Sequence, residues 1–228
     1  MEVSEFVELF KQQYKPVIPI RRIIPKMNAE AVLEAFKIIG NDITGGTFVI
    51  DESNTKLYEY LSHWVCGDFK EATKGLYLYG NSGTGKSVSM RILAEFFRQV
   101  TLSYYIKEDR RSISIEMVNA QSIISDYAHC GDFEKYLEAP ILCINDLGAE
   151  ICRNKQDYVS EAIYMGNRVN VIKTILELRG EDETKITFIT SNFPQGAPIM
   201  KLVYGDRVLS RLKNMCLTFE LGGVDRRK

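Results

Sequence analysis

A glycine-rich stretch about one third of the way along the chain carries the clearest chemistry in the sequence. From Gly80 it reads G-x-x-x-x-G-K-S and ends at Ser87. Glycines at these positions let consecutive backbone N–H groups surround a polyphosphate, beside the positive end of the next helix. Lys86 would reach the β- and γ-phosphates, and the Ser87 hydroxyl would ligate Mg²⁺. The stretch therefore predicts binding of a nucleoside triphosphate, through Gly80, Asn81, Ser82, Gly83, Thr84, Gly85, Lys86, Ser87 and Val88.

The segments on either side of this stretch are those that a phosphate-binding loop requires. The apolar run 76–79 is typical of a short buried strand. A strand, a glycine loop and a helix in this order separate a nucleotide-binding P-loop from an incidental turn. After Ser87, apolar residues recur at spacings of three and four, which predicts a helix with one buried face. These residues are Met90, Leu93, Phe96, Phe97 and Val100.

A second apolar run ends in the acidic group that nucleotide hydrolysis needs. Residues 141–144 read I-L-C-I and are followed by Asn145 and Asp146. In P-loop proteins an acidic side chain at such a strand end holds Mg²⁺ or orients the attacking water. The position of Asp146 therefore predicts a catalytic role for it.

Apolar runs alternate with amphipathic helical patterns over most of the chain. This alternation favours an α/β fold with a parallel sheet that helices cover on both faces. A short strand is also predicted at 47–51, and the hydrophilic segment 107–112 is predicted to be a loop. The other predicted strands are 113–118, 141–144, 186–190 and 216–221, and the other predicted helices cover 57–65, 123–127, 171–176 and 206–214.

Residues 1–44 are predicted to form a short N-terminal helical arm, and residues 45–228 the nucleotide-binding domain. The arm holds two apolar stripes with helical spacing, separated by the proline-rich segment 16–25, which cannot be a regular helix. Either the arm docks a partner protein, or its helices pack back on the core. The sequence favours neither reading. The stripes are Val3, Phe6, Val7, Phe10 and Tyr14, and then Val32, Ala35, Phe36 and Ile39.

Composition excludes several other classes of protein. The formal net charge is −1, so no overall field favours nucleic acid. No apolar run approaches the roughly 18 residues of a membrane span, and the acidic N-terminus lacks the features of a signal peptide. The five cysteines contain no C-x-x-C pair and are predicted to be reduced thiols. A cytoplasmic location is therefore expected.

One local cluster has the composition of a site for single-stranded DNA. Tyr104 and Tyr105 are close in sequence to Lys107, Arg110 and Arg111. Aromatic residues that stack on bases and basic residues that follow the backbone are the components of such sites. Packing of the tyrosines in the core explains the same residues equally well, so single-stranded DNA binding stays one of two hypotheses here.

Several segments in order resemble the DnaC/IstB-type AAA+ ATPases, which load replicative helicases or assist transposases. The resemblance covers roughly residues 45–228 and implies an AAA+ core with five parallel strands that binds ATP and Mg²⁺. Seven residues follow Leu221, so no C-terminal lid domain is expected, and this absence is typical of the family that the sequence resembles. The segments are GLYLYGNSGTGKS (75–87), ILCINDLGAE (141–150), TFITSN (187–192), YGDRVLSRL (204–212) and GGVDRRK (222–228).

The resemblance assigns a metal site with one departure from the family pattern. Asn145 and Asp146 would occupy the two Walker B positions and would surround the metal together with Ser87. The family usually has an acidic residue where this chain has Asn145. A neutral amide weakens the attraction for Mg²⁺ and the field that favours hydrolysis. We therefore expect an ATPase that binds ATP well and turns it over slowly.

The resemblance also assigns roles to later polar residues. Asn192 would align the attacking water near the γ-phosphate. Arg211 would be the arginine finger that enters a neighbouring subunit's site, with Arg207 as the alternative. Arg227, or Arg226, would take the sensor-2-like position near the C-terminus. A finger that acts between subunits implies a homo-oligomer in the ATP-bound state.

Four functions remain open at this point. The first is a DnaC-type loader in DNA replication, whose N-terminal arm grips a replicative helicase. The second is an IstB-like helper of transposition, with a transposase and duplex DNA as partners. The third is a small-molecule or nucleotide kinase, which the late paired arginines disfavour. The fourth is an ATP-dependent adaptor without hydrolysis, which Asn145 would allow.

Overall fold

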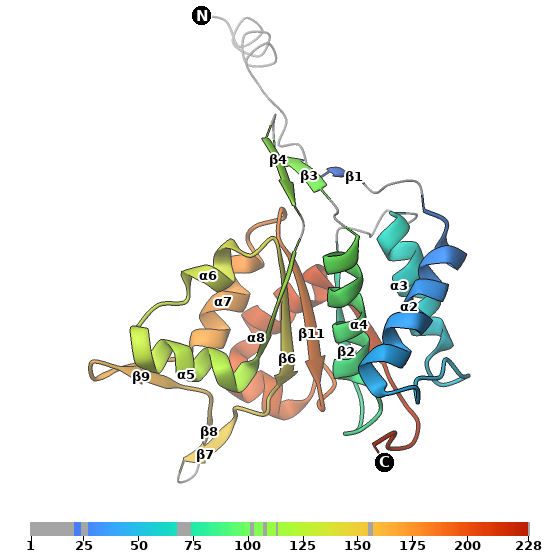
Figure 1. The fold of residues 1–228 in the computed structure, drawn as a ribbon. Coiled ribbons are helices and arrows are strands. Elements are labelled where there is room, and N and C mark those ends of the chain that lie inside the picture. The colour runs from blue at the N-terminus through green and yellow to red at the C-terminus, as the bar shows by residue number, and fades with distance from the viewer. Residues whose placement is uncertain are drawn as a thin grey trace, which may run out of the picture.

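A five-stranded parallel sheet forms the centre of the molecule, as the sequence predicts (Figure 1). The computed structural model describes residues 21–23, 27–67, 74–100, 103–106, 109–112, 114–154 and 157–227. Every pair of neighbouring strands in the central sheet runs parallel. In order across the sheet, the strands are β12 (Cys216–Glu220), β2 (Gly75–Tyr79), β11 (Ile186–Ser191), β6 (Ile141–Leu147) and β5 (Ile115–Asn119).

The central strands are apolar on both faces because helices cover both faces. Leu76 and Leu78 of β2 belong to one buried hydrophobic cluster, whereas Tyr77 between them belongs to a second. Successive side chains of a strand lie on opposite faces, so the two clusters lie on opposite sides of the sheet. Burial on both sides explains why these strands appear in the sequence as continuous apolar runs.

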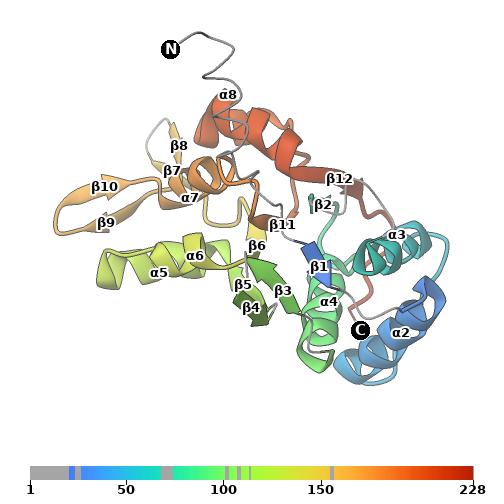
Figure 2. The same cartoon turned by 90° about the horizontal axis from the view of Figure 1, so that it is seen from above.

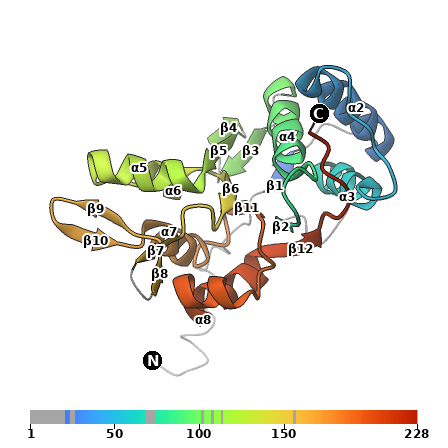
Figure 3. The same cartoon turned by 90° about the horizontal axis from the view of Figure 1, so that it is seen from below.

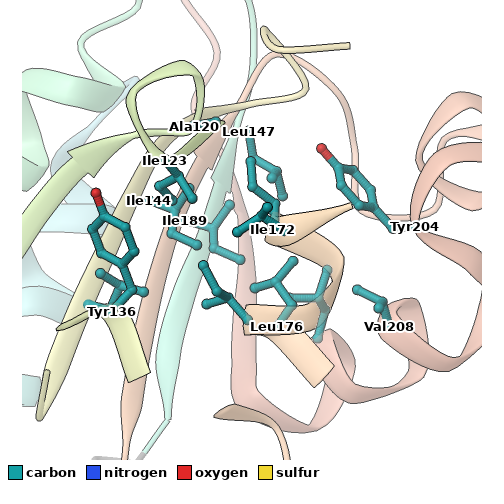
Figure 4. Close-up of a cluster of buried hydrophobic side chains, with 14 of the residues drawn as sticks. Ala120, Ile123, Tyr136, Ile144, Leu147, Ile172, Leu176, Ile189, Tyr204 and Val208 are labelled. Carbon is teal, nitrogen blue, oxygen red and sulfur yellow. The ribbon is translucent and has the colours of Figure 1, made fainter. Parts of the chain in front are cut away.

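The helices divide between the two clusters. Figure 2 shows α4 and α8 on opposite sides of the sheet, and Figure 3 shows the same layers from below. Figure 4 shows the second cluster, with Ile144 and Ile189 from the sheet. The first cluster includes residues of α2 (Ala29–Thr44), α3 (Thr55–Cys66) and α4 (Lys86–Gln99), and the second includes residues of α5 (Ala120–Cys130), α6 (Glu134–Glu138), α7 (Val171–Arg179) and α8 (Pro198–Met215).

Helix α2 packs on the core and does not stand apart from it. Its Val32 and Phe36 are buried in the first cluster. The Phe36 ring meets Phe96 of α4 edge to face, with the ring centroids 5.3 Å apart. For residues 29–44, therefore, the structure agrees with the interpretation that the N-terminal helices pack back on the core. The first predicted stripe, Val3 to Tyr14, lies outside the described residues, and a partner-binding role for residues 1–44 stays a prediction.

The strand predicted at 47–51 is wrong, because this segment is neither helix nor strand. The Asn54 side chain fixes its path. Its oxygen accepts a hydrogen bond from the backbone of Asp51 at 2.8 Å, and its amide donates to the carbonyl of Val49 at 3.0 Å. Side chains of this type offer the backbone local partners that compete with a strand ladder.

The loop predicted at 107–112 is also wrong at residues 109–112, which form a strand of a small antiparallel sheet. Strand β3 lies in the middle of this sheet and pairs with β4 on one side and with β1 on the other. Short edge strands tolerate charged residues, so the hydrophilic composition of residues 109–112 did not indicate that they form a strand. The three strands are β1 (Arg21–Ile23), β3 (Ser103–Ile106) and β4 (Asp109–Ser112).

Two hairpins after β6 were not predicted from the sequence. Each of their strands has three residues, too few for a periodic pattern to be recognised. Met165 and Gly166 close the second hairpin with φ angles of 47° and 82°, as a tight hairpin turn requires. The pairs are β7 (Cys152–Asn154) with β8 (Asp157–Val159), and β9 (Ala162–Tyr164) with β10 (Asn167–Val169).

Other features bear on the composition-based expectations. All five cysteines are free thiols, as predicted. Within the part of the chain that the structure describes, no helix has the length and apolarity needed to cross a bilayer.

Helix α8 begins at Pro198, earlier than the predicted helix 206–214, and is kinked at Gly205, where φ is 81°. Neither helix nor strand follows β12 among residues 221–227.

Candidate nucleotide-binding site

The predicted P-loop joins the carboxyl end of β2 to the first turn of α4. Gly85 is the N-cap of α4 and has a φ of 100°, a conformation that residues with a Cβ rarely adopt. Gly83 has a φ of 82°, and a Cβ at this position would also meet the carboxylate of Asp225. These two glycines therefore allow the loop to turn tightly at the N-terminus of α4, where backbone N–H groups are free to bind an anion.

Lys86 occupies the centre of the loop, and only 5% of its surface is exposed. Its ammonium group donates hydrogen bonds to the carbonyls of Gly80 and Asn81, at 2.8 and 2.7 Å, and to Oδ1 of Asn192, at 3.0 Å. Burial lowers the pKa of Lys86, and the nearby Asp146 carboxylate opposes this shift. A phosphate oxygen would offer the ammonium a charge-assisted bond that is stronger than those to neutral carbonyls. The fit between this cradle and a polyphosphate is therefore good.

Asp146 and Asn145 occupy different environments at the end of β6. Asp146 lines the same cavity as Lys86 and Ser87, and its backbone is left-handed, with a φ of 55°. Asn145 is 5% exposed and is not among the residues that line the cavity. Thr190 connects the two, because its hydroxyl accepts from the Asp146 backbone at 2.9 Å and donates to Oδ1 of Asn145 at 3.2 Å. The metal role of Asn145 stays a prediction.

The residues after Asp146 anchor the end of β6 to α8. Glu150 is buried, and its carboxylate accepts hydrogen bonds from the Gly148 backbone, the Ser160 hydroxyl and the Tyr204 hydroxyl. Burial raises the pKa of Glu150, and the hydrogen bond from Tyr204 opposes the rise. Tyr204 immediately precedes the kink at Gly205. The site strand is thus tied to the helix that carries Arg207 and Arg211.

A cavity of about 720 Å³ extends from the P-loop to the segment before α3. Its volume lies within the range of small-molecule and cofactor sites. Ser82 to Ser89, Asp146 and Asn192 all line the cavity, so the predicted catalytic residues Asp146 and Asn192 share it with the P-loop. Residues between Thr44 and Tyr58 also line it, and nothing in the sequence indicated their part in the site.

The C-terminal tail closes one side of the cavity. The Arg226 backbone donates to the carbonyl of Gly83 at 2.9 Å, and its guanidinium binds the Asp51 carboxylate at 2.6 Å. Arg227 donates to the Ser82 hydroxyl at 2.8 Å. A hydrogen bond from Ser53, and then Arg226, hold the pKa of Asp51 below its usual value. Both arginines that were candidates for the sensor-2-like position line the cavity.

Arg207 and Arg211 lie on α8 and are not among the residues lining their own chain's cavity. Both bind the same carboxylate oxygen of Glu181, at 3.1 and 2.5 Å. The Arg211 side chain is 18% exposed and also donates to the carbonyl of Glu177, whereas Arg207 is 66% exposed. A role for either in the chain's own site is therefore not favoured, and action on a neighbouring subunit stays a prediction.

The strand order, the loop after β2 and the polar side chains at the ends of β6 and β11 give the arrangement of a P-loop nucleotide-binding fold. No protein-family model matches the sequence. The chain is 23% identical to the replicative helicase loader DnaI of Bacillus subtilis (strain 168), over 92% of this chain and 67% of that protein.

Solved structures give the same fold. The crystal structure of DnaI is 24% identical, covers 88% of this chain and 94% of its own, and has a TM-score of 0.54. The DnaC helicase loader is 18% identical, covers 77% of this chain and 93% of its own, and has a TM-score of 0.53. The AAA+ fold is thus confirmed, and so is the resemblance to DnaC-type AAA+ ATPases that the motifs indicated.

Proposed function

We propose that this protein is an ATP-binding AAA+ switch of the helicase-loader type that acts with a replicative helicase in DNA replication. The observation that carries the proposal is the meeting of Lys86, Asp146 and Asn192 at one cavity of about 720 Å³. The similarity to a protein named as a replicative helicase loader supports the partner class. A calorimetric titration of the unaltered chain with MgATP tests ATP binding.

In this proposal the phosphates of ATP lie on the P-loop, where Lys86 exchanges its carbonyl partners for phosphate oxygens. The Ser87 hydroxyl and the Asp146 carboxylate, which both line the cavity, would hold Mg²⁺. The metal would neutralise the charge that develops on the phosphates. The base would lie beside Tyr58 and the Arg226–Asp51 pair, which also line the cavity.

We propose that hydrolysis is slow because Asn145 is neutral, and that its replacement by aspartate accelerates it. The Asn145→Asp variant keeps an oxygen that can accept from Thr190, and it adds a negative charge next to Asp146. One added charge near a divalent ion should raise the turnover number roughly tenfold or more. Phosphate release at saturating Mg²⁺ and ATP measures the change.

The matched control for this prediction is Asn28→Asp, which makes the same charge change at the N-cap of α2. Asn28 accepts a hydrogen bond from the Ala31 backbone at 3.0 Å, and aspartate caps a helix equally well. Turnover of this variant should equal that of the unaltered chain. If Asn145→Asp binds ATP but shows no turnover under any condition, the reading as an ATP-dependent adaptor without hydrolysis replaces the slow ATPase.

We propose that Arg211 completes the site of a neighbouring subunit in an ATP-bound homo-oligomer. Two groups, the Glu181 carboxylate and the Glu177 carbonyl, orient its guanidinium, whereas among the described residues Arg207 has only the longer bond to Glu181. Arginine fingers contribute roughly 10³-fold or more to turnover in related chemistry. Arg211→Ala should therefore lose turnover at unchanged ATP affinity, and Arg207→Ala should lose much less.

A mixing experiment separates action between subunits from action within one subunit. Arg211→Ala keeps an intact P-loop, and a Lys86→Met chain keeps an intact Arg211. Each variant alone should be inactive, and a mixture of the two should regain turnover because the second chain supplies the arginine to the first. Absence of any recovery, with both variants able to assemble, would contradict a role for Arg211 in a neighbouring site.

A further inference from the structure

The last described residues of the chain lie against the P-loop without forming a helix or a strand. We call residues 221–227 the tail. At its start the Leu221 backbone donates a hydrogen bond to the carbonyl of Tyr79 at 2.7 Å, and further along the Arg226 backbone donates to the carbonyl of Gly83 at 2.9 Å. Figures 2 and 3 both show the end of the chain near α2 and α4. Two backbone contacts therefore hold the tail along the loop that is expected to bind phosphate.

The Arg226 side chain crosses from the P-loop to the segment before α3. A Cβ at Gly85 would lie 3.8 Å from Cδ of Arg226, so the stem of the side chain passes beside the start of α4. Its guanidinium donates to the Asp51 carboxylate at 2.6 Å, to the Ser53 hydroxyl at 2.7 Å and to the carbonyl of Val49 at 3.4 Å. One arginine thus connects two of the segments that line the cavity, although 175 positions separate it from Asp51.

Each of these two segments exposes an apolar side chain where it lines the cavity. Val49, before α3, is 57% exposed, and Val224, in the tail, is 79% exposed. Single exposed apolar residues are common on protein surfaces, but apolar groups that line a cavity are typical of a ligand site. The flat ring of a base offers both valines an apolar partner. The two side chains therefore indicate a ligand that contacts both the tail and the segment before α3.

We propose that Arg226 and Asp51 form a latch, which holds the tail over a bound nucleotide and has to open before the nucleotide enters or leaves. The inference deepens the proposed function and rests on it for the binding of ATP at this cavity. Opening the latch breaks a charge-assisted hydrogen bond, which is stronger than a bond between neutral groups. Exchange of the nucleotide is therefore slow, as a switch that acts through its ATP-bound state requires.

The contacts of both partners distinguish the latch from an ordinary surface ion pair. Isolated surface pairs contribute little, because two long side chains lose their freedom for one weak attraction. Here Oδ1 of Asp51 accepts from the backbone and the hydroxyl of Ser53, at 3.0 and 2.7 Å, while Oδ2 binds Arg226. The Arg226 side chain is 27% exposed, and its backbone is bound to Gly83. Both partners are thus oriented in advance, so little freedom is lost when they pair.

The test measures how fast ATP leaves the chain. The unaltered chain and its variants are loaded with MgATP and mixed with an excess of a fluorescent ATP analogue, whose signal appears as ATP is released. Asp51→Asn and Arg226→Gln each remove one charge of the latch and keep a polar side chain. Each should accelerate release by about fivefold or more, as the loss of a charge-assisted bond between partly exposed groups predicts. Association should be as fast as in the unaltered chain or faster, whereas damage to the site would slow it.

A combined variant shows whether the two residues act on each other. Asp51→Asn with Arg226→Gln should release ATP no faster than Arg226→Gln alone, because one latch is lost only once. Effects that multiply in the combined variant would overturn the latch. Glu95→Gln is the matched control, since it breaks a pair of the same length, 2.6 Å, with Arg98 on α4. Neither residue of that pair is among those that line the cavity, so release should stay unchanged.

Hydrogen exchange in the tail gives a second readout, which does not depend on the rate of release. The Arg226 amide is bonded to the Gly83 carbonyl and exchanges slowly as long as the tail is held. ATP should slow this exchange in the unaltered chain. Asp51→Asn should accelerate it, with ATP and without. Equal exchange in Asp51→Asn and in the unaltered chain would overturn the latch.

The outcomes separate the latch from the proposed function. If the unaltered chain binds ATP and both single variants release it at the unaltered rate, the latch is overturned and the ATP-binding function stands. A chain that binds no ATP would refute the proposed function and the latch with it. Faster release from both single variants, with undiminished association and faster exchange in the tail, is the result that the latch predicts.

Discussion

Replacement of Lys86 by methionine is expected to weaken the binding of MgATP by about 100-fold or more. The ammonium group is the buried cation at the centre of the P-loop, and its present partners include the carbonyls of Gly80 and Asn81. Each hydrogen bond to a charged phosphate contributes about 1.5–3 kcal/mol, and the variant loses all of those from Lys86. Methionine retains the length and the apolar part of the side chain, so the loop keeps its packing.

Lys201→Met is the matched control, because Lys201 lies on α8, is exposed and pairs only with Asp206 among its described charged neighbours. Its affinity for ATP should be unchanged. Titration calorimetry measures both dissociation constants. Thermal unfolding gives a second readout, since a ligand that binds the folded state raises the unfolding temperature. ATP should stabilise the control and fail to stabilise Lys86→Met. Equal stabilisation of both would contradict the placement of the phosphates.

Replacement of Arg179 by leucine is expected to lower the free energy of unfolding by about 3 kcal/mol or more. Arg179 is 2% exposed, and burial lowers its pKa to about 10, so it is still charged at neutral pH. Its guanidinium donates to the carbonyls of Tyr136 and Ala139 near the end of α6. It also donates to the Ile186 carbonyl and the Thr187 hydroxyl in β11. Leucine would leave these buried acceptors without a donor, at about 1–3 kcal/mol each.

Arg98→Leu is the control for this prediction, since Arg98 is exposed and pairs with Glu95 one turn earlier on α4. A surface pair of this kind contributes about 0–1 kcal/mol, so the free energy of unfolding should change little. Urea titrations of both variants and of the unaltered chain measure the difference. A loss of less than about 1 kcal/mol in Arg179→Leu would show that water replaces the guanidinium, and would contradict its role as the link between α6 and β11.

The sequence was sufficient for the parts of the site that depend on local patterns. The P-loop has fixed spacing, and Leu76–Tyr79 and residues 141–144 are continuous apolar runs because their strands are buried on both faces. The parallel sheet followed from these runs. The resemblance to a known family put Asn192 near the γ-phosphate that Lys86 was expected to reach, and the structure brings the two side chains within hydrogen-bond distance.

The features that could not be predicted depend on contacts between distant segments. Nothing local in the sequence pairs Arg226 with Asp51, because each is an ordinary charged residue until the tail folds over the P-loop. The segment 47–51 looks like a strand because its apolar residues outweigh the effect of Asn54 in a short window. The register of β1 against β3 likewise depends on segments that are about eighty residues apart.

The central claim is that the cavity above the P-loop binds ATP. The most direct measurement is a calorimetric titration of the unaltered chain with MgATP, with phosphate release followed on the same preparation. The account predicts one saturable site with a dissociation constant in about the micromolar range, together with slow turnover that Asn145→Asp accelerates. No saturable binding up to millimolar ATP, by a chain that unfolds cooperatively on heating, would contradict the assignment of the P-loop and with it the proposed function.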